Sequence, residues 1–300
     1  MKGQKGLRSL LYSQSLAPYV FTLPFVLMFA IFFIYPLISS VVMSFQSVLP
    51  GDVRFIGLDN FRRLFNADFY QAVKNSFVYT VLTLAVLIPG PMILACFLNS
   101  KVTLGKNVFR SVFFIPVLTS VVVAGTIFRL IFGEIPGALM NTIVGFFGHA
   151  PVKWLRIQST TYMTLVLLAC WRWTGVNILY YLAGLQSIPG DLYESASIDG
   201  ASTLQKFRHI TMPMLKPTTI YVLTISIYGG FAMFIESYML FAGNRSPGGI
   251  GLTIIGYLYR QGWEHNNLGF GSAIGLSLLL IVMIINVIQL KFFGLFRRED

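Results

Sequence analysis

The chain of 300 residues has the composition of a membrane protein. Hydrophobic residues make up 55% of it and charged residues only 11%, with a mean hydropathy of +0.72, whereas soluble domains carry about a quarter charged residues. The formal net charge is +11, but the basic residues cluster at the ends of apolar runs, which argues against a nucleic-acid-binding face. We therefore exclude a soluble domain and expect lipid, not nucleic acid, around this chain.

Six apolar runs are each long enough to cross a bilayer, which takes roughly 20 residues. In chain order they cover residues 18–45, 72–98, 108–132, 162–186, 217–243 and 269–294. The first extends well past the core of a signal peptide and has no clear cleavage site, so we expect it to stay as an anchor. The pattern predicts an all-α integral membrane protein in three parts: residues 1–17, a six-span domain over 18–295, and a tail over 296–300.

Lys and Arg in the short loops and tails predict the orientation, because cytosolic loops carry the excess of positive charge. With a cytosolic amino terminus, the inner side holds twelve of them: Lys2, Lys5, Arg8, Lys101, Lys106, Arg110, Lys206, Arg208, Lys216, Lys291, Arg297 and Arg298. The outer side holds eight: Arg54, Arg62, Arg63, Lys74, Lys153, Arg156, Arg245 and Arg260. Both termini are then expected in the cytosol.

A polar loop over residues 187–217 separates the fourth and fifth runs and carries helical signals. Asp191 and Glu194 form a capping-box-like pair that predicts a short helix after Pro189. Gly200 is expected to end it, since glycine adopts positive φ at little cost. A second short helix is predicted over about 202–210, ending before Pro213. Capping signals alone indicate no more than a structured connector.

The order of residues in this loop resembles the "EAA" loop of ABC importer permeases. That pattern has E-A-A, a glycine four residues later, and an isoleucine ten residues after the glycine. Glu194, Ser195, Ala196, Gly200 and Ile210 occupy it here, with Pro213 one position before the usual proline and Ser195 replacing an alanine.

The resemblance implies the type I ABC importer permease fold, in which the loop forms a cytosolic coupling helix seated on the ATPase subunit. The ATPase-coupling residues it indicates are Glu194, Ser195, Ala196, Asp199, Gly200, Ala201, Phe207 and Pro213. No GxxxxGK[ST] phosphate loop occurs in the chain, so we expect a non-enzymatic subunit without a bound cofactor. ATP and Mg would be used by a separate ATPase in two copies. A second, homologous permease and an extracytoplasmic sugar-binding protein would complete the importer in the bacterial plasma membrane.

The resemblance covers nearly the whole chain and points to carbohydrate importers. Segments such as APYVFTLPF and CWRWTGVNILYYLAGLQSIP look like the first permease of maltose and oligosaccharide importers. SFQSVLPG, FRLIFGE and YVLTISIYGGF resemble the branch that imports arabino-oligosaccharides in Gram-positive bacilli. AGNRSPGG stands where many relatives carry T-x-GGP, which leaves the identity of the sugar open.

The energetically costly charges inside the predicted spans are Arg172 and Glu236. Charges at such depth face a cavity or each other, and a structural ion pair and a sugar-facing role have equal weight. Aromatic and amide side chains nearby suit a sugar, whose C–H faces stack and whose hydroxyls need partners. The substrate-path candidates are Trp171, Arg172, Trp173, Asn177, Tyr180, Tyr228, Phe231, Glu236 and Tyr238.

The main alternative is an ion-coupled secondary sugar transporter, which would predict inverted repeats or a relay of buried carboxylates. Neither is evident in this sequence. No catalytic residue or metal site is indicated: the histidines His149, His209 and His265 fall in loops, and Cys96 and Cys170 lie in apolar stretches without metal-ligand spacing.

Overall fold

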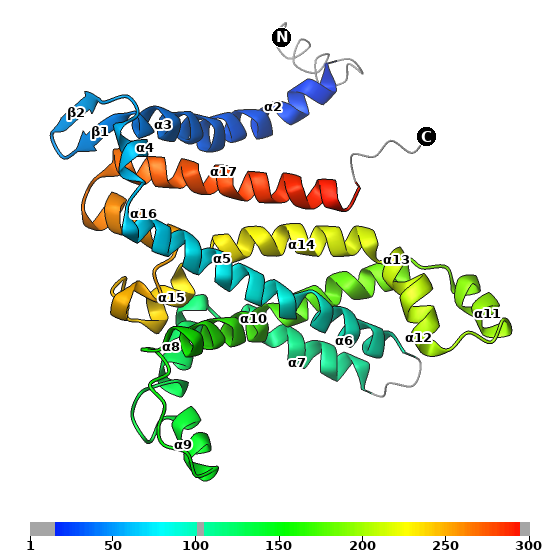
Figure 1. Ribbon diagram of the computed structural model, residues 1–300. Coiled ribbons are helices and arrows are strands. Elements are labelled where there is room, and N and C mark those ends of the chain that lie inside the picture. The colour runs from blue at the N-terminus through cyan, green and yellow to red at the C-terminus, as the bar shows by residue number, and fades with distance from the viewer. Residues whose placement is uncertain (1–15, 101–104, 295–300) are drawn as a thin grey trace, which may run out of the picture. The chain divides into compact units, whose positions relative to one another are not determined.

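A computed structural model describes residues 16–100 and 105–294, and Figure 1 shows the described chain as helices with a single β-hairpin. The predicted tail over 296–300 and nearly all of the predicted segment over 1–17 lie outside the described residues. So do six of the basic residues used for orientation: Lys2, Lys5, Arg8, Lys101, Arg297 and Arg298.

The chain divides into two compact units, of which the first comprises Met1–Leu64 and Gln261–Leu276. Its described part begins with one continuous helix formed by α2 (Ala17–Phe29), the π-helical turn η1 (Ala30–Ile34) and α3 (Tyr35–Ser44). The strands β1 (Gln46–Leu49) and β2 (Asp52–Phe55) and the short helix α4 (Asp59–Arg63) follow. The buried Asn60 donates to the carbonyls of Ser44 at 2.9 Å and Gln46 at 2.8 Å, which holds α4 against the start of the hairpin.

The second unit comprises Phe65–Arg260 and Ser277–Asp300. Its elements are α5 (Ala67–Leu87), α6 (Pro89–Asn99), α7 (Lys106–Leu118), α8 (Val121–Ile131), α9 (Leu139–Phe146), α10 (Gln158–Gln186), α11 (Gly190–Ile198), α12 (Thr203–Lys206), η2 (Phe207–Thr211), α13 (Met212–Met214), α14 (Lys216–Phe231), α15 (Ile235–Leu240), η3 (Pro247–Gly249) and α16 (Ile254–Tyr259). The last two elements, η4 (Arg260–Glu264) and α17 (Leu268–Phe292), have residues in both units.

Four described helical segments are long and apolar enough to cross a membrane unaided: Ala17–Ser44, Ala67–Asn99, Gln158–Gln186 and Leu268–Phe292. They match the first, second, fourth and sixth predicted runs. Two pairs of bent helices could each count as one further span: Lys106–Leu118 with Val121–Ile131, and Thr203–Met214 with Lys216–Phe231. Counting both pairs gives up to six spans. The composition therefore located the apolar runs correctly but did not reveal which of them are broken.

The third and fifth predicted runs are not single straight helices. The third bends by 97° between α7 and α8, because Thr119 and Ser120 adopt extended backbone conformations just after Pro116, which lacks a backbone donor. In the fifth, the helix ends at Phe231 rather than continuing to residue 243, and α15 begins only at Ile235. The second parts of both runs are short separate helices, α8 and α15, and these two helices pack against each other.

Two apolar clusters form the core of the second unit. In the first, α10 packs against α6 and α14 through Ile178, Tyr181 and Leu215 among others. The second cluster includes Tyr79 of α5, Leu165 of α10 and Trp154, which precedes α10. Residues of α15 and of the segment before α9 also belong to it. In Figure 1 the green, cyan and yellow helices α10, α5 and α14 lie side by side, and α10 contributes to both clusters. This long helix is thus the central support of the unit.

Glycine allows the closest helix contact in this unit. α10 meets α7 at Gly175, where an added Cβ would overlap the backbone carbonyl of Phe113. At Gly229 of α14, an added Cβ would meet nothing within 4 Å.

We expect Gly175→Ala to destabilise the folded protein by about 1–3 kcal/mol, because a backbone atom cannot move aside as a flexible side chain can. Gly229→Ala, the matched control, should be neutral or slightly stabilising, because alanine is the better helix former. Thermal unfolding of the two purified variants tests this, and equal midpoints would contradict the proposed close contact.

Candidate functional site

The loop over 187–217 folds as the two short helices expected, but its capping differs from the prediction. α11 begins at Gly190, so Asp191 lies inside the first turn and no side chain caps the helix. The predicted Asp191–Glu194 capping box was therefore wrong. A complete capping box is present at the second helix, where the Gln205 amide donates to Ser202 Oγ at 3.3 Å and the Ser202 amide to Gln205 Oε1 at 2.7 Å.

Gly200 ends the first helix, as predicted. Its φ is +75°, the Ala201 amide donates to the Ala196 carbonyl at 2.8 Å, and the Gly200 amide donates to the Ser197 carbonyl at 3.2 Å. These two bonds satisfy carbonyls that the end of the helix leaves unpaired. A residue with a Cβ would strain this position, since L-residues pay roughly 1–2 kcal/mol in the left-handed region.

The second helix does not stop before Pro213, contrary to the prediction. It continues through α12, η2 and α13 to Met214. In the π-helical turn η2, the Met212 amide reaches back to the Phe207 carbonyl, so the chain stays helical up to the proline. Pro213 then sits in the first turn of α13, where a missing donor is tolerated.

The two short helices are tied to each other and to the helices of the membrane domain. Tyr193 Oη and Thr211 Oγ1 share a hydrogen bond of 2.9 Å, and Lys206 Nζ donates to Ser197 Oγ at 2.6 Å. Tyr193, Phe207 and Ile210 pack against the first apolar cluster. Phe207 therefore faces the apolar cluster formed by α6, α10 and α14.

Most of the predicted coupling residues are exposed. Glu194, Ser195, Asp199, Gly200 and Pro213 are exposed, whereas Ala196 and Ala201 are half-buried.

Sequence reasoning missed five exposed apolar side chains of the loop: Ile198 at 86%, Leu204 at 74%, Met212 at 47%, Met214 at 45% and Leu192 at 42% exposure. Large apolar side chains in an otherwise polar loop are the signal that could have revealed them, because such side chains mark protein contacts when they gather on a surface.

A cavity of about 560 Å³ lies between the two apolar clusters, lined by residues of α5, α10, α14 and α15, by the linker between α14 and α15, and by one residue each from α8 and α16. Six of the predicted substrate-path residues line it: Arg172, Trp173, Asn177, Tyr180, Tyr228 and Glu236. Sequence reasoning missed Tyr79, Thr83 and Ser226, which also line the cavity. Hydroxyl-bearing residues within an apolar span were the available signal.

The other three predicted residues do not line this cavity. Trp171 packs on Phe128, with ring centroids 5.8 Å apart. Phe231 is a core residue with 2% exposure. Tyr238 belongs to an aromatic group with Phe234 and Tyr259, at centroid distances of 5.2 and 5.8 Å.

The two buried charges form an ion pair across the cavity wall. Arg172 Nη1 lies 3.2 Å from Glu236 Oε1, and the side chains are only 10% and 16% exposed. The guanidinium carbon also lies 5.3 Å from the Trp173 ring. The structural ion pair considered from the sequence is thus confirmed, and removing either partner would leave the other charge buried at a cost of about 3–5 kcal/mol.

The Asn177 side chain donates a hydrogen bond to a backbone carbonyl that proline leaves without its helical partner. Pro91 lacks the N–H that would bond the carbonyl four residues earlier, which is that of Leu87. The Asn177 side chain, with 3% exposure, donates its Nδ2 to this carbonyl at 3.1 Å. In lipid such a carbonyl must find a partner within the protein, so Asn177 on α10 stabilises the break between α5 and α6.

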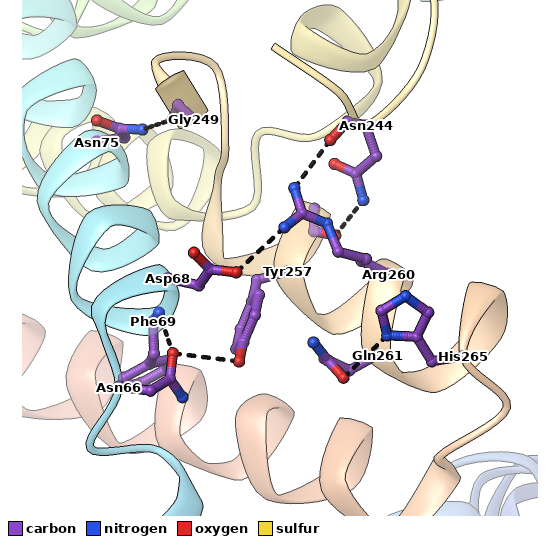
Figure 2. A network of polar contacts seen from close by, with 11 residues as sticks. Asn66, Asp68, Phe69, Asn75, Asn244, Gly249, Tyr257, Arg260, Gln261 and His265 are labelled. Carbon is purple, nitrogen blue, oxygen red and sulfur yellow. Dashed lines mark hydrogen bonds and ion pairs between the residues drawn. The ribbon is translucent and has the colours of Figure 1, made fainter. Parts of the chain in front are cut away.

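Figure 2 shows a polar network that fastens the segment after α15 to the start of α5. Asn75 Nδ2 donates to the carbonyls of Gly249 at 2.8 Å and Leu252 at 2.9 Å. Arg260 donates to the Asn244 carbonyl at 2.9 Å and pairs with Asp68 at 3.4 Å. These contacts hold the loop between α15 and α16 against α5. No local sequence pattern predicted them.

Comparison with known proteins identifies the family. The chain matches the family described as "Binding-protein-dependent transport system inner membrane component" over residues 87–293, and it belongs to this family. It is 55% identical over 296 residues to the arabinooligosaccharides transport system permease protein AraP of Bacillus subtilis (strain 168), covering 99% of this chain and 94% of AraP. The AraP of Halalkalibacterium halodurans is 48% identical, covering 96% and 91%.

The fold also resembles a solved transporter. A bacterial ABC transporter involved in the import of the acidic polysaccharide alginate matches with a TM-score of 0.81 and 24% identity, covering 95% of this chain and 96% of that one. The type I ABC importer permease fold predicted from the sequence is therefore confirmed. Family membership also decides against the secondary transporter considered as the alternative.

The proline–asparagine pair can be tested with a double-mutant cycle. Asn177→Ala should destabilise the protein by about 1–3 kcal/mol, the cost of leaving a buried polar group unpaired. In a Pro91→Ala background the loss should be smaller, because the restored N–H of residue 91 can bond Leu87. Thermal or denaturant unfolding of the four proteins measures this, and an equal loss in both backgrounds would show that Asn177 acts otherwise.

Proposed function

We propose that this chain is one of two permease subunits of an ATP-driven plasma-membrane importer of arabino-oligosaccharides, with both termini in the cytosol. The single observation that carries the proposal is the 55% identity to an arabinooligosaccharide permease over 99% of the chain. A second, homologous permease would complete the translocation pore. An extracytoplasmic binding protein would deliver the sugar, in keeping with the family's description as binding-protein-dependent.

The exposed side of the 187–217 loop is the surface we propose for a separate ATPase, present in two copies and using ATP and Mg. Glu194, Asp199 and Gly200 would lie in the contact, together with the newly recognised Ile198 and Leu204. Phe207 would act differently from the expectation, as an anchor, because it packs against the apolar cluster of α6, α10 and α14. Movement of the ATPase would then reach the membrane helices through Tyr193, Phe207 and Ile210.

The cavity is the place we propose for the passing sugar. Trp173, Tyr180 and Tyr228 supply aromatic faces for stacking against C–H groups, and Thr83 and Ser226 supply hydroxyls. Arg172 and Glu236 neutralise each other, so the wall offers no net charge from this pair. A neutral oligosaccharide suits such a lining.

Ligand screening tests the cargo directly. The cognate binding protein should bind arabino-oligosaccharides more tightly than malto- or galacto-oligosaccharides of the same length, and only the preferred sugar should stimulate ATP hydrolysis by the reconstituted complex. A preference for another sugar would reject the arabinose assignment and leave the transporter class intact.

Two substitutions in the loop test coupling. Glu194→Lys reverses a charge on the exposed surface, and Gly200→Val places a branched residue at a φ of +75°. Both should abolish uptake of radiolabelled arabino-oligosaccharide by cells while membrane insertion stays normal. Ser195→Ala, a control that restores the residue common in the family pattern, should transport normally. Wild-type uptake by either of the first two variants would reject the coupling role.

Two neighbouring tryptophans on α10 test the sugar path. Trp173 lines the cavity and Trp171 does not, although their exposures are nearly equal at 42% and 40%. Trp173→Ala should lower uptake and sugar-stimulated ATP hydrolysis about tenfold, since an aromatic stacking contact contributes roughly 1–1.5 kcal/mol. Trp171→Ala should reduce them far less. Equal effects of the two substitutions would argue against this cavity as the path.

A further inference from the structure

The hairpin that follows the first membrane helix has two chemically different faces. β1 and β2 are antiparallel, with Val48 opposite Val53 and Gln46 opposite Phe55. Side chains alternate along a strand, and directly opposed residues share a face. Val48, Val53, Phe55 and the half-buried Gln46 therefore lie on one face, where Val53 is 63% and Phe55 77% exposed.

The opposite face is polar and largely neutralises itself. It carries Ser47, Arg54 and Asp52, with Leu49 beside the turn. Arg54 forms a bidentate ion pair with Asp52: its Nε donates to Oδ1 at 2.8 Å and its Nη2 donates to Oδ2 at 2.6 Å. The hydrogen bond from the Arg54 guanidinium lowers the pKa of the Asp52 carboxyl. The hairpin thus presents a closed ion pair on one side and bare apolar side chains on the other.

The position of the hairpin is set by the helix before it. The apolar helical segment Ala17–Ser44 has a mean hydropathy of 2.5 over its most apolar window, and Gln46 begins β1 only two residues after its end. Because Phe55 pairs with Gln46, it lies at the base of the hairpin, within a few ångströms of the helix end. The headgroup layer on each side of a bilayer is about 5–8 Å thick, so a helix that ends at the edge of the hydrocarbon core would place Phe55 within this layer.

Several contacts within the same unit hold the base of the hairpin against the end of the helix before it. The Ile56 amide donates to the Phe45 carbonyl at 2.9 Å, and Asn60 holds the carbonyls of Ser44 and Gln46. At Gly269, in the first turn of α17, a Cβ would overlap the Gln46 carbonyl. The hairpin is therefore a rigid extension of the membrane helix.

We propose that the hairpin packs its Val53–Phe55 face into the interfacial layer of the lipid bilayer, at the membrane surface where the first helix ends. Aromatic side chains favour this layer, and a two-faced element binds it through its apolar side. The apolar face follows directly on the apolar helix Ala17–Ser44, whose most apolar window has no buried residue in this chain, and the only charges on the ribbon are paired with each other. Lipid fits these features better than a charged protein surface. The hairpin would thus anchor the end of the first helix in depth and rotation.

Spin labels at three consecutive positions test this in the complete transporter reconstituted into phosphatidylcholine–phosphatidylglycerol vesicles. Both native cysteines, Cys96 and Cys170, are first replaced by alanine, and Val53→Cys, Arg54→Cys and Phe55→Cys are then labelled one at a time. Collision rates with oxygen, which concentrates in lipid, and with a water-soluble nickel chelate are measured. The oxygen-to-nickel ratio should be several-fold higher at 53 and 55 than at 54, the matched control on the same strand.

Three results would overturn the proposal. One is a ratio that does not alternate along the strand. Another is shielding of positions 53 and 55 from both probes, in vesicles and in detergent alike, which would indicate a protein subunit on this face. The third is shielding that appears only when the sugar-binding protein is added, which would make the face its docking surface. None of these readouts requires sugar transport, so failure here is distinct from failure of the proposed function.

Discussion

A membrane interior offers no water to a backbone carbonyl, and this constraint shapes the centre of the second unit. Between α5 and α6, Pro91 lacks the N–H that would bond the carbonyl of Leu87, and this carbonyl receives its hydrogen bond from Asn177 on α10. The bond joins the α5–α6 span to the longest helix of the unit at the wall of the cavity. The proline and the side chain that compensates for it are thus supplied by neighbouring spans.

The same principle explains how charges persist at this depth. Arg172 and Glu236 come from α10 and α15, and each is acceptable in an apolar setting because the other is 3.2 Å away. Glu236 reaches that position because the fifth run breaks after Phe231 and restarts at Ile235. The partner helix α8 arises from the sharp bend of the third run, and Gly125 lets it approach Met239 of α15 closely. The broken runs therefore build the end of the cavity that straight helices would leave open.

The polar loop has two unlike sides. Tyr193, Phe207 and Ile210 join it to the apolar cluster around α10, while Glu194, Ile198 and Gly200 face outward. The coupling role proposed above requires a rigid link, because a flexible connector would absorb a displacement. The capping box at Ser202 and the tight turn at Gly200 contribute to that rigidity by pairing backbone groups at the ends of both short helices.

The sequence by itself determined the membrane class, the six apolar runs, the end of α11 at Gly200 and, through the order of residues in the loop, the family. These depend on composition or on local backbone preference, which each stretch of chain carries alone. Only the tertiary structure decided that the third and fifth runs are broken, that Trp173 lines the cavity while Trp171 does not, and that Asn177 serves the carbonyl of Leu87. A membrane helix is apolar on every side, so its pattern does not reveal which face meets a neighbour, and a partner some ninety residues away is known only after packing.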